Sequence, residues 1–376
     1  MNLKKILLFY GSYGGGHLSA AKSLKEYIDK NYPESETKLV DCMEYINKTV
    51  NKITTSAYSY MAKKAPGVWK TVYNSSEKGL FSKISNTANK QMASKLNKCI
   101  SEFNPDLIIS THPFSSQMCS ILKSKEKINC KVATVMTDFH IHNQWIVKHE
   151  YMDYYFVSNN QMKEDLCTKG VNENKVFVTG IPFSERFLQN FDKENIFKEF
   201  GLNTNKLTAL FFAGGEFGLG KSRTFAIFES LVKNFPQVQV VAVAGRNEQM
   251  KKLFTDCVKT FHREDEICVL DYTNKVPELM AISDFVITKP GGLTTTESLV
   301  SSLPMIIINP IPGQEEQNAE FLENAGVGVW LKKNDDIKIT LEKFFESKEK
   351  LNEMKNNAIK LARPNSIREI IRVLFD

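Results

Sequence analysis

The stretch that decides the fold reads Leu7-Leu8-Phe9-Tyr10-Gly11-Ser12-Tyr13-Gly14-Gly15-Gly16-His17-Leu18-Ser19-Ala20-Ala21. A short apolar run leads through a glycine-rich loop into a segment with helical periodicity, which predicts a buried strand, a turn and a helix. Gly14, Gly15 and Gly16 let the backbone approach a ligand closely, and the first N–H groups of the helix point into the same space. His17 stands beside these groups, where it can accept a proton.

Strand and helix signals alternate along the whole chain, which is typical of parallel α/β sheets. With 376 residues and 42% hydrophobic residues, the chain is long enough for two cores. We expect an α/β fold of two Rossmann-like domains facing a cleft, residues 1–185 and 186–363, with a C-terminal helix at about 364–376 packing back on the first. The predicted strands are Lys5–Tyr10, Lys38–Asp41, Leu107–Ser110, Val132–Thr137, Tyr154–Val157, Val176–Thr179, Leu207–Ala213, Val238–Ala244, Cys268–Leu270, Phe285–Ile287 and Met305–Ile308.

The composition argues against several classes of protein. No apolar run approaches the roughly 20 residues that span a bilayer, and the start Met1-Asn2-Leu3-Lys4-Lys5 has no small-residue cleavage site. The seven cysteines form no C-x-x-C pair and no His/Cys metal spacing, so we expect reduced thiols and no metal site. The sequence therefore predicts a cytoplasmic protein.

The net charge of +6 is concentrated in one stretch. Residues 48–98 contain ten lysines and one acid, so this stretch carries about +9 and the rest of the chain about −3. Aromatic residues are interleaved with the lysines, as at Lys63, Lys64 and Trp69. This mixture suits an anionic membrane surface. Nucleic acid is a competing partner, and a solvated lysine-rich helical surface is a third interpretation; we expect the membrane and no nucleic acid.

Two interpretations fit the glycine-rich segment of the second half. Residues 215–222, from Gly215 to Ser222, satisfy the Walker A pattern after a predicted strand, and Ile267–Asp271 resembles a Walker B strand. However, the additional glycine Gly214 follows the strand directly. A turn that aims helix N–H groups at a diphosphate without Mg²⁺ explains these glycines equally well, and we favour it.

A second strand–turn–helix corner is predicted at Lys289–Glu297, where Gly291 and Gly292 precede a helix. Glu297, expected on the first turn of this helix, could accept both hydroxyls of a ribose. Alternatively, Thr294 and Glu297 form only a capping box. The following segment, residues 309–318, gathers amides and acids that can discriminate sugar hydroxyls: Gln314, Glu315 and Asn318.

In the first half, residues 136–145 follow a buried strand and bring together an acid, two histidines and a tryptophan. Asp138 could orient a histidine base and stabilise its charge. We expect His140 and His149 to be structural. His112, at the end of another predicted strand, faces the same cleft.

Taken together, these segments resemble the GT-B glycosyltransferases that make glycolipids, namely monogalactosyldiacylglycerol synthases and processive diacylglycerol glucosyltransferases. The resemblance covers nearly the whole chain and rests on an ordered set of motifs. These motifs are G-G-G-H-x-x-A-A at Gly14–Ala21, T-D-F-x-x-H-x-x-W at Thr137–Trp145, T-G-I-P at Thr179–Pro182, the Gly214–Gly218 turn, G-R-N-E at Gly245–Glu248, K-P-G-G-L-T-T-x-E at Lys289–Glu297 and P-G-Q-E-x-x-N at Pro312–Asn318.

The resemblance implies an inverting hexosyltransferase that uses UDP-glucose or UDP-galactose as co-substrate, diacylglycerol or glycosyl-diacylglycerol as acceptor and no further cofactor. It implies a protein held peripherally at the inner face of the cell membrane. His17 would be the base, with Asp138 beside it. The implied donor-binding residues are Gly214, Gly215, Arg246, Gly291, Gly292, Thr294, Glu297, Gln314, Glu315 and Asn318. The implied acceptor and membrane residues are Gly15, Gly16, His142, Trp145, Lys63, Lys64 and Trp69.

The sequence is also compatible with other functions. The same frame would suit a UDP-sugar epimerase or an N-acetylglucosaminyl transferase. Less expected are a P-loop NTPase and a non-catalytic nucleotide-binding protein.

Overall fold

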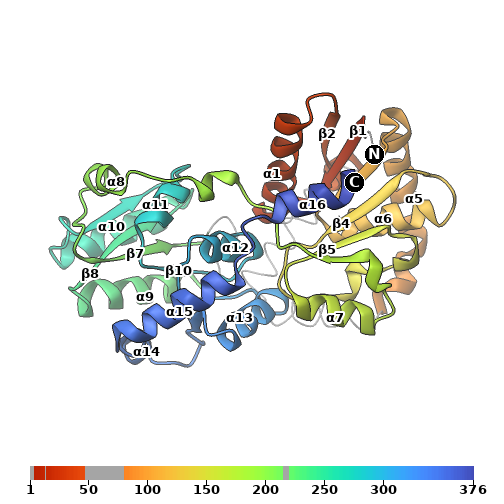
Figure 1. Ribbon diagram of the computed structural model, residues 1–376. Helices are drawn as coiled ribbons and strands as arrows, with labels where there is room; N and C mark the ends of the chain where they lie inside the picture. The colour runs from red at the N-terminus through yellow and green to blue at the C-terminus, as the bar shows by residue number, and fades with distance from the viewer. Residues whose placement is uncertain (1–3, 13, 47–79, 215–219) are drawn as a thin grey trace. The chain divides into compact units, whose positions relative to one another are not determined.

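The computed structural model describes residues 4–12, 14–46, 80–214 and 220–376 (Figure 1). In the helix that begins at Leu80, side chains are described from Met92 onward. The chain divides into two compact units. Unit 1 comprises Met1–Ser184, Pro312–Gln314 and Arg363–Asp376, and unit 2 comprises Glu185–Ile311 and Glu315–Ala362.

Unit 1 is built on a parallel six-stranded sheet with the order β2-β1-β3-β4-β5-β6. Its strands are β1 (Lys5–Tyr10), β2 (Glu36–Asp41), β3 (Leu107–Ser110), β4 (Lys131–Val135), β5 (Tyr154–Val157) and β6 (Val176–Val178). Its helices are α1 (Gly15–Asn31), α2 (Cys42–Ile46), α5 (Leu80–Phe103), α6 (Pro113–Lys123), α7 (Asn160–Thr168) and α16 (Ser366–Phe375), with short 3₁₀ helices η1 (Asn143–Trp145), η2 (His149–Tyr151) and η3 (Glu173–Lys175).

Both faces of this sheet are covered by helices. On β1, Leu7 and Phe9 belong to the core formed with α5, α6 and α7, because successive side chains of a strand point to opposite faces. Ile6 and Leu8 belong to the other core, formed with α1 and α16. The C-terminal helix α16 lies beside α1 in Figure 1, and the two helices are in contact. The last helix of the chain therefore completes the first unit.

Unit 2 has a second parallel six-stranded sheet, with the order β12-β11-β10-β7-β8-β9. Its strands are β7 (Leu207–Phe212), β8 (Val238–Val243), β9 (Ile267–Leu270), β10 (Phe285–Thr288), β11 (Met305–Ile307) and β12 (Gly328–Trp330). Its helices are the 3₁₀ helix η4 (Glu185–Leu188), α8 (Lys193–Glu199), α9 (Lys221–Asn234), α10 (Glu248–Thr260), α11 (Val276–Ile282), α12 (Gly292–Val300), α13 (Gln314–Asn324), α14 (Ile337–Phe344) and α15 (Lys348–Leu361).

Each sheet has a point at which the strand order reverses direction, and such a switch point is where open α/β sheets bind ligands. Counted within unit 2, the strand order is the 3-2-1-4-5-6 of a Rossmann fold, and it reverses between β7 and β10. In unit 1 the order reverses between β1 and β3. The glycine turns after β1 and β10 therefore lie at the positions that the topology favours for ligands.

All eleven predicted strands are present, with ends shifted by at most two residues. β4 ends at Val135 rather than Thr137, although the Met136 N–H still donates to the Phe156 carbonyl (2.9 Å). The twelfth strand, Gly328–Trp330, was not predicted, because three residues carry too little pattern to stand out.

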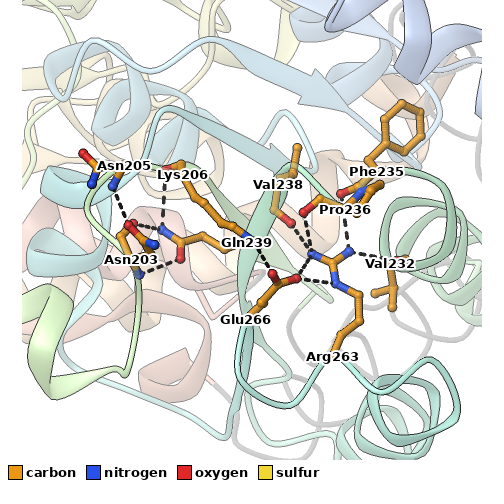
Figure 2. Close-up of polar contacts among 10 residues, drawn as sticks. All are labelled: Asn203, Asn205, Lys206, Val232, Phe235, Pro236, Val238, Gln239, Arg263 and Glu266. Atoms are coloured by element: carbon orange, nitrogen blue, oxygen red, sulfur yellow. Dashed lines mark hydrogen bonds and ion pairs between the residues drawn. The ribbon is translucent and has the colours of Figure 1, made fainter.

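A buried arginine fixes the amino end of the unit 2 sheet. Arg263 is 8% exposed and bonds with the Glu266 carboxylate, which also pairs with Lys206 (Figure 2). Its guanidinium also donates to four backbone carbonyls, those of Val232 (2.9 Å), Phe235 (3.3 Å), Pro236 (3.4 Å) and Val238 (2.7 Å). The arginine thereby ties the end of α9 and the start of β8 to the turn before β9.

Among the helices that the structure describes, none combines the length and the apolar character needed to cross a bilayer.

Candidate active site

The corner after β1 has the predicted strand–loop–helix form. Gly14 precedes the helix with φ of 89°, a conformation that favours glycine, and α1 begins at Gly15. Gly14, the N-cap residue, has no side chain to cap this helix end, so among the residues that the structure describes no side-chain cap bonds the first N–H groups of α1. His17 is the third residue of α1 and is partly buried.

Two threonines hold His17. Its Nδ1 lies 2.6 Å from the backbone carbonyl oxygen of Thr111 and 2.9 Å from Oγ1 of Thr137. The Thr111 hydroxyl in turn donates to the His17 backbone carbonyl (2.8 Å). Thr111 follows β3 and Thr137 follows β4, so neighbouring strand ends converge on one imidazole.

A second histidine packs against the first. The rings of His17 and His112 are nearly perpendicular, with centroids 4.6 Å apart. His112 caps α6, where its Nδ1 accepts a hydrogen bond from the Phe114 N–H (3.2 Å). Gly11 leaves room for this ring, since a Cβ at Gly11 would lie 2.9 Å from His112 Cδ2. The glycine is therefore required by packing at this point.

Burial keeps the histidines of this corner neutral. It lowers the pKa of His17 to about 4, although the hydrogen bond to Thr111 opposes the shift. The pKa of His142 falls to about 3, first through burial and then through the charges of His17 and His140. The pKa of His112 is also well below its usual value, for the same main reason. At neutral pH each of the three imidazoles has one nitrogen with a lone pair.

The remaining predicted residues of unit 1 are more deeply placed. Asp138 is 3% exposed, and its carboxylate accepts a hydrogen bond from Gln314 Nε2 (2.7 Å), which groups with unit 1. Trp145 is 1% exposed and belongs to the core, with its ring 5.7 Å from that of His142. The sequence singled out Asp138 as the orienting group, whereas the described partners of His17 Nδ1 are Thr111 and Thr137. Thr111 directly follows β3, and Thr137 lies two residues after β4 at the same edge of the sheet. Their positions after predicted strands were visible in the sequence, although no local pattern links them to His17.

In unit 2, the turn after β10 leads into α12. The helix begins at Gly292, with Gly291 as its uncapped N-terminal residue. Thr294 is therefore inside the helix and cannot cap it, so the capping-box interpretation is wrong. Glu297 was expected on the first turn of this helix, but it lies on the second. Within the described part of the chain, no side-chain cap bonds the N–H groups at the start of α12, which point out of a glycine turn.

Glu297 is mostly shielded from water, and burial raises the pKa of its carboxyl to about 8. Any ligand that donates hydrogen bonds to this carboxyl stabilises its charged form, because such bonds offset the cost of desolvation.

Helix α13 is fastened to the same turn. Asn318 is fully buried and donates to the Pro290 carbonyl (3.0 Å). Glu315 pairs with Lys289 (3.4 Å) and accepts from the Ile311 N–H (2.7 Å). The structure therefore brings together the two segments that the sequence assigned to the donor. It also shows that Asn318 and Glu315 hold the turn in place.

Two further turns of unit 2 follow β7 and β8, the next two strands of the sheet after β10. Gly214, directly after β7, has φ of 86°. Arg246 follows β8, and its guanidinium lies 5.5 Å from the ring centre of Tyr272, an aromatic side chain that is 68% exposed. Of the Walker-type residues, Lys221 bonds to Gln249 (3.1 Å) and Asp271 pairs with Lys251. The lysine and the aspartate that an NTPase would use are thus both bonded to side chains of α10.

Four predicted residues cannot be placed: Gly215, Lys63, Lys64 and Trp69 lie outside the described residues. Within the described ranges, no group of three or more His, Cys, Asp or Glu side chains could hold a metal ion.

Both halves of the chain are similar to known proteins. A family model described as monogalactosyldiacylglycerol (MGDG) synthase matches residues 17–183, and one described as glycosyl transferases group 1 matches residues 192–361. The processive diacylglycerol beta-glucosyltransferase of Bacillus pumilus (strain SAFR-032) is 31% identical over 99% of this chain and 95% of its own length. The protein of the same name from Bacillus subtilis (strain 168) is 30% identical over 98% of this chain and 94% of its own length.

Solved structures share the architecture. UDP-GlcNAc 2-epimerase from Neisseria meningitidis, bound to UDP-GlcNAc, has a TM-score of 0.65 at 15% identity, with 99% of each chain covered. MurG from Acinetobacter baumannii has a TM-score of 0.61 at 11% identity, also with 99% of each chain covered. At these identities the likeness shows the fold alone, which is the two-domain α/β fold of GT-B type.

Proposed function

Since this chain belongs to the family of processive diacylglycerol glucosyltransferases, we propose that it transfers a hexose from a UDP-sugar to diacylglycerol or glycosyl-diacylglycerol. Membership makes it a hexosyltransferase of glycolipid synthesis. The observation that best supports the proposal is His17, a neutral imidazole held at the switch point of unit 1.

We assign the UDP-sugar to unit 2. The uncapped start of α12, at Gly291 and Gly292, offers N–H groups and the positive end of a helix dipole to a diphosphate. Glu297 would accept hydrogen bonds from the ribose hydroxyls, which would stabilise its buried carboxylate. Gly214 and Arg246 would lie near the diphosphate, with Thr294 at the helix start. Gln314, Glu315 and Asn318 would then serve the sugar, the last two mainly by holding the turn.

The proposed chemistry is one displacement. The acceptor hydroxyl oxygen forms a bond to the anomeric carbon while the bond from that carbon to the UDP oxygen breaks, and the hydroxyl proton passes to His17. Attack opposite the leaving group inverts the anomeric configuration. Negative charge develops on the departing diphosphate, where helix N–H groups and Arg246 stabilise it. The scheme needs the UDP-sugar as co-substrate and assigns no role to a metal or other cofactor.

We propose that the lysine- and aromatic-rich segment of residues 48–98 holds the enzyme against an anionic membrane surface. Each Lys near such a surface adds about 1 kcal/mol of attraction, and aromatic rings settle at headgroup depth. This segment includes Lys63, Lys64 and Trp69. The enzyme would work peripherally at the inner face of the cell membrane, where diacylglycerol is its acceptor.

Product analysis tests the proposal. The protein is incubated with radiolabelled UDP-glucose or UDP-galactose and vesicles of diacylglycerol with an anionic phospholipid, and lipid products are separated. We expect a labelled glycolipid from one donor, lost in His17→Gln and retained in His149→Gln, a histidine of η2 away from the site. Competition between the two donors then identifies the hexose.

The absence of a lipid product with both donors would overturn the proposal. A water-soluble epimer formed without acceptor would instead indicate an epimerase. That alternative shares the fold of the Neisseria meningitidis protein but leaves the segment of residues 48–98 without a role.

A further inference from the structure

We propose that Thr111 and Thr137 are positioning residues, which keep the proton of neutral His17 on Nδ1 and so present Nε2 as the basic nitrogen. The inference deepens the proposed function and rests on His17 being its base. The tautomer of His17 is nevertheless a property of the protein alone and can be measured without any substrate.

The shortest contact decides which nitrogen carries the proton. His17 Nδ1 lies 2.6 Å from the Thr111 backbone carbonyl oxygen, and a carbonyl oxygen can only accept a hydrogen bond. If Nδ1 carried a lone pair, two lone pairs would face each other at this distance. Nδ1 must therefore donate. In a neutral imidazole the other nitrogen, Nε2, is then the acceptor.

Thr111 holds His17 at two places. Its carbonyl accepts from the ring, and its hydroxyl donates to the His17 backbone carbonyl (2.8 Å). Thr111 itself is fully buried, and its N–H donates to the Phe9 carbonyl (3.0 Å), which continues the β1–β3 pairing. Thr111 thereby fixes the position of the His17 ring relative to the central strands of the sheet.

Thr137 supplies a second oxygen to the same nitrogen. Its Oγ1 is 2.9 Å from His17 Nδ1, and the residue, two positions after β4, is 4% exposed. When Nε2 takes the proton of the acceptor hydroxyl, the ring becomes an imidazolium and positive charge is shared by both nitrogens. The oxygens of Thr111 and Thr137 then face the charged N–H, where their hydrogen bonds are stronger than to the neutral ring.

His112 restricts the orientations that the His17 ring can adopt. Its ring lies edge-on to that of His17 and is held as the cap of α6, so the His17 ring cannot swing toward α6 without displacing it. Because His112 Nδ1 accepts from the Phe114 N–H, its own proton is on Nε2. The two neighbouring histidines therefore have opposite tautomers, and this is a distinctive signature.

Nitrogen NMR of the ring signals tests the tautomer. The full chain has six histidines, and the spectrum of ¹⁵N-labelled protein at pH 7.5 is compared with that of His17→Gln to assign the His17 ring. We expect a neutral His17 ring protonated on Nδ1. A neutral ring protonated on Nε2, or a charged ring at this pH, would overturn the inference whether or not the protein proves active.

Three variants test the part played by Thr137. Thr137→Val keeps the shape and removes the oxygen, and Thr137→Ser keeps the oxygen. Thr179→Val is the matched control, because Thr179 is a buried threonine of unit 1 whose hydroxyl donates to the Gly180 carbonyl (3.3 Å). We expect Thr137→Val to lower kcat roughly 3- to 10-fold with KM unchanged, which corresponds to one lost hydrogen bond. Thr137→Ser should restore most of kcat and Thr179→Val should leave it unchanged.

An unchanged kcat in Thr137→Val, or a loss that serine does not restore, would contradict the role of Thr137. If no variant and no wild-type protein forms glycolipid, the proposed function fails, while the NMR result still decides the tautomer.

Discussion

Truncation of Arg263 to alanine should strongly destabilise unit 2. The guanidinium group is buried and bonds with Glu266 and with four backbone carbonyls of the α9–β8 connection (Figure 2). Alanine would leave these carbonyls without their donor. Glu266 would retain only its pair with Lys206.

The magnitude follows from these contacts. Leaving a buried carbonyl without its donor costs about 1–3 kcal/mol. The two shortest of these bonds, to Val232 and Val238, therefore account for about 2–6 kcal/mol. For a unit of this size, each kcal/mol lowers the unfolding midpoint by roughly 2–4 °C. We therefore expect the unit 2 transition of Arg263→Ala to fall by roughly 4–24 °C. Arg263→Lys, which keeps one cation but not the planar fork, should fall by about half as much.

Differential scanning calorimetry of the full chain measures the effect. Arg223→Ala is the matched control, because Arg223 is only partly buried and makes one described hydrogen bond, to the Lys332 carbonyl. Binding of UDP at 15 °C, below the unfolding transition, should be unchanged in Arg263→Ala. A midpoint within about 2 °C of the wild type, or a loss equal to that of Arg223→Ala, would refute the reasoning.

Three further outcomes are expected. His17 should contribute roughly 3 kcal/mol to the fall in the free energy of unfolding between pH 6.5 and about pH 4, because its folded pKa is about 4 and the unfolded chain binds its proton first. Urea unfolding of wild type and His17→Gln at pH 6.5 and pH 4 measures this contribution as the difference between the two proteins, since His112 and His142 contribute in the same direction in both. Glu297 has the opposite sign: its folded pKa of about 8 makes the protein lose stability as the pH rises above 4.5, so Glu297→Gln should raise the unit 2 midpoint at pH 9 but weaken UDP binding about 10-fold or more by calorimetry. Gly11→Ala should cost about 1–3 kcal/mol and disturb the His112 ring signals, because the new Cβ meets that ring at 2.9 Å; an unchanged spectrum would contradict the packing argument.

Much of the fold could be predicted from the sequence because parallel strands are buried on both faces and read as continuous apolar runs. This pattern was enough to place β1 with its correct ends and to place the glycine turns after β1 and β10. β12 lacked such a run. The network of Arg263 could not be predicted either, because four of its partners are backbone carbonyls, which carry no sequence signal.

The candidate site was predicted in part. His17 and the Gly291 turn follow from local motifs, and the structure places both at switch points. The contacts of His17 with Thr111 and Thr137 join residues that are 94 and 120 positions apart. No local pattern specifies such pairs. The capping box at Thr294 failed for a related reason, since the helix starts where the glycine turn ends and not where a favourable capping residue occurs.

The position of α16 has a consequence for biosynthesis. Ile367, Ile370, Ile371 and Leu374 help to cover the sheet face that carries Ile6 and Leu8, although they are translated after the whole of unit 2. All residues of unit 2 are therefore synthesised before unit 1 has its full set of helices. Until α16 has been synthesised, one apolar face of unit 1 lacks part of its cover, so a chain that terminates before Ser366 would present that face to chaperones and proteases.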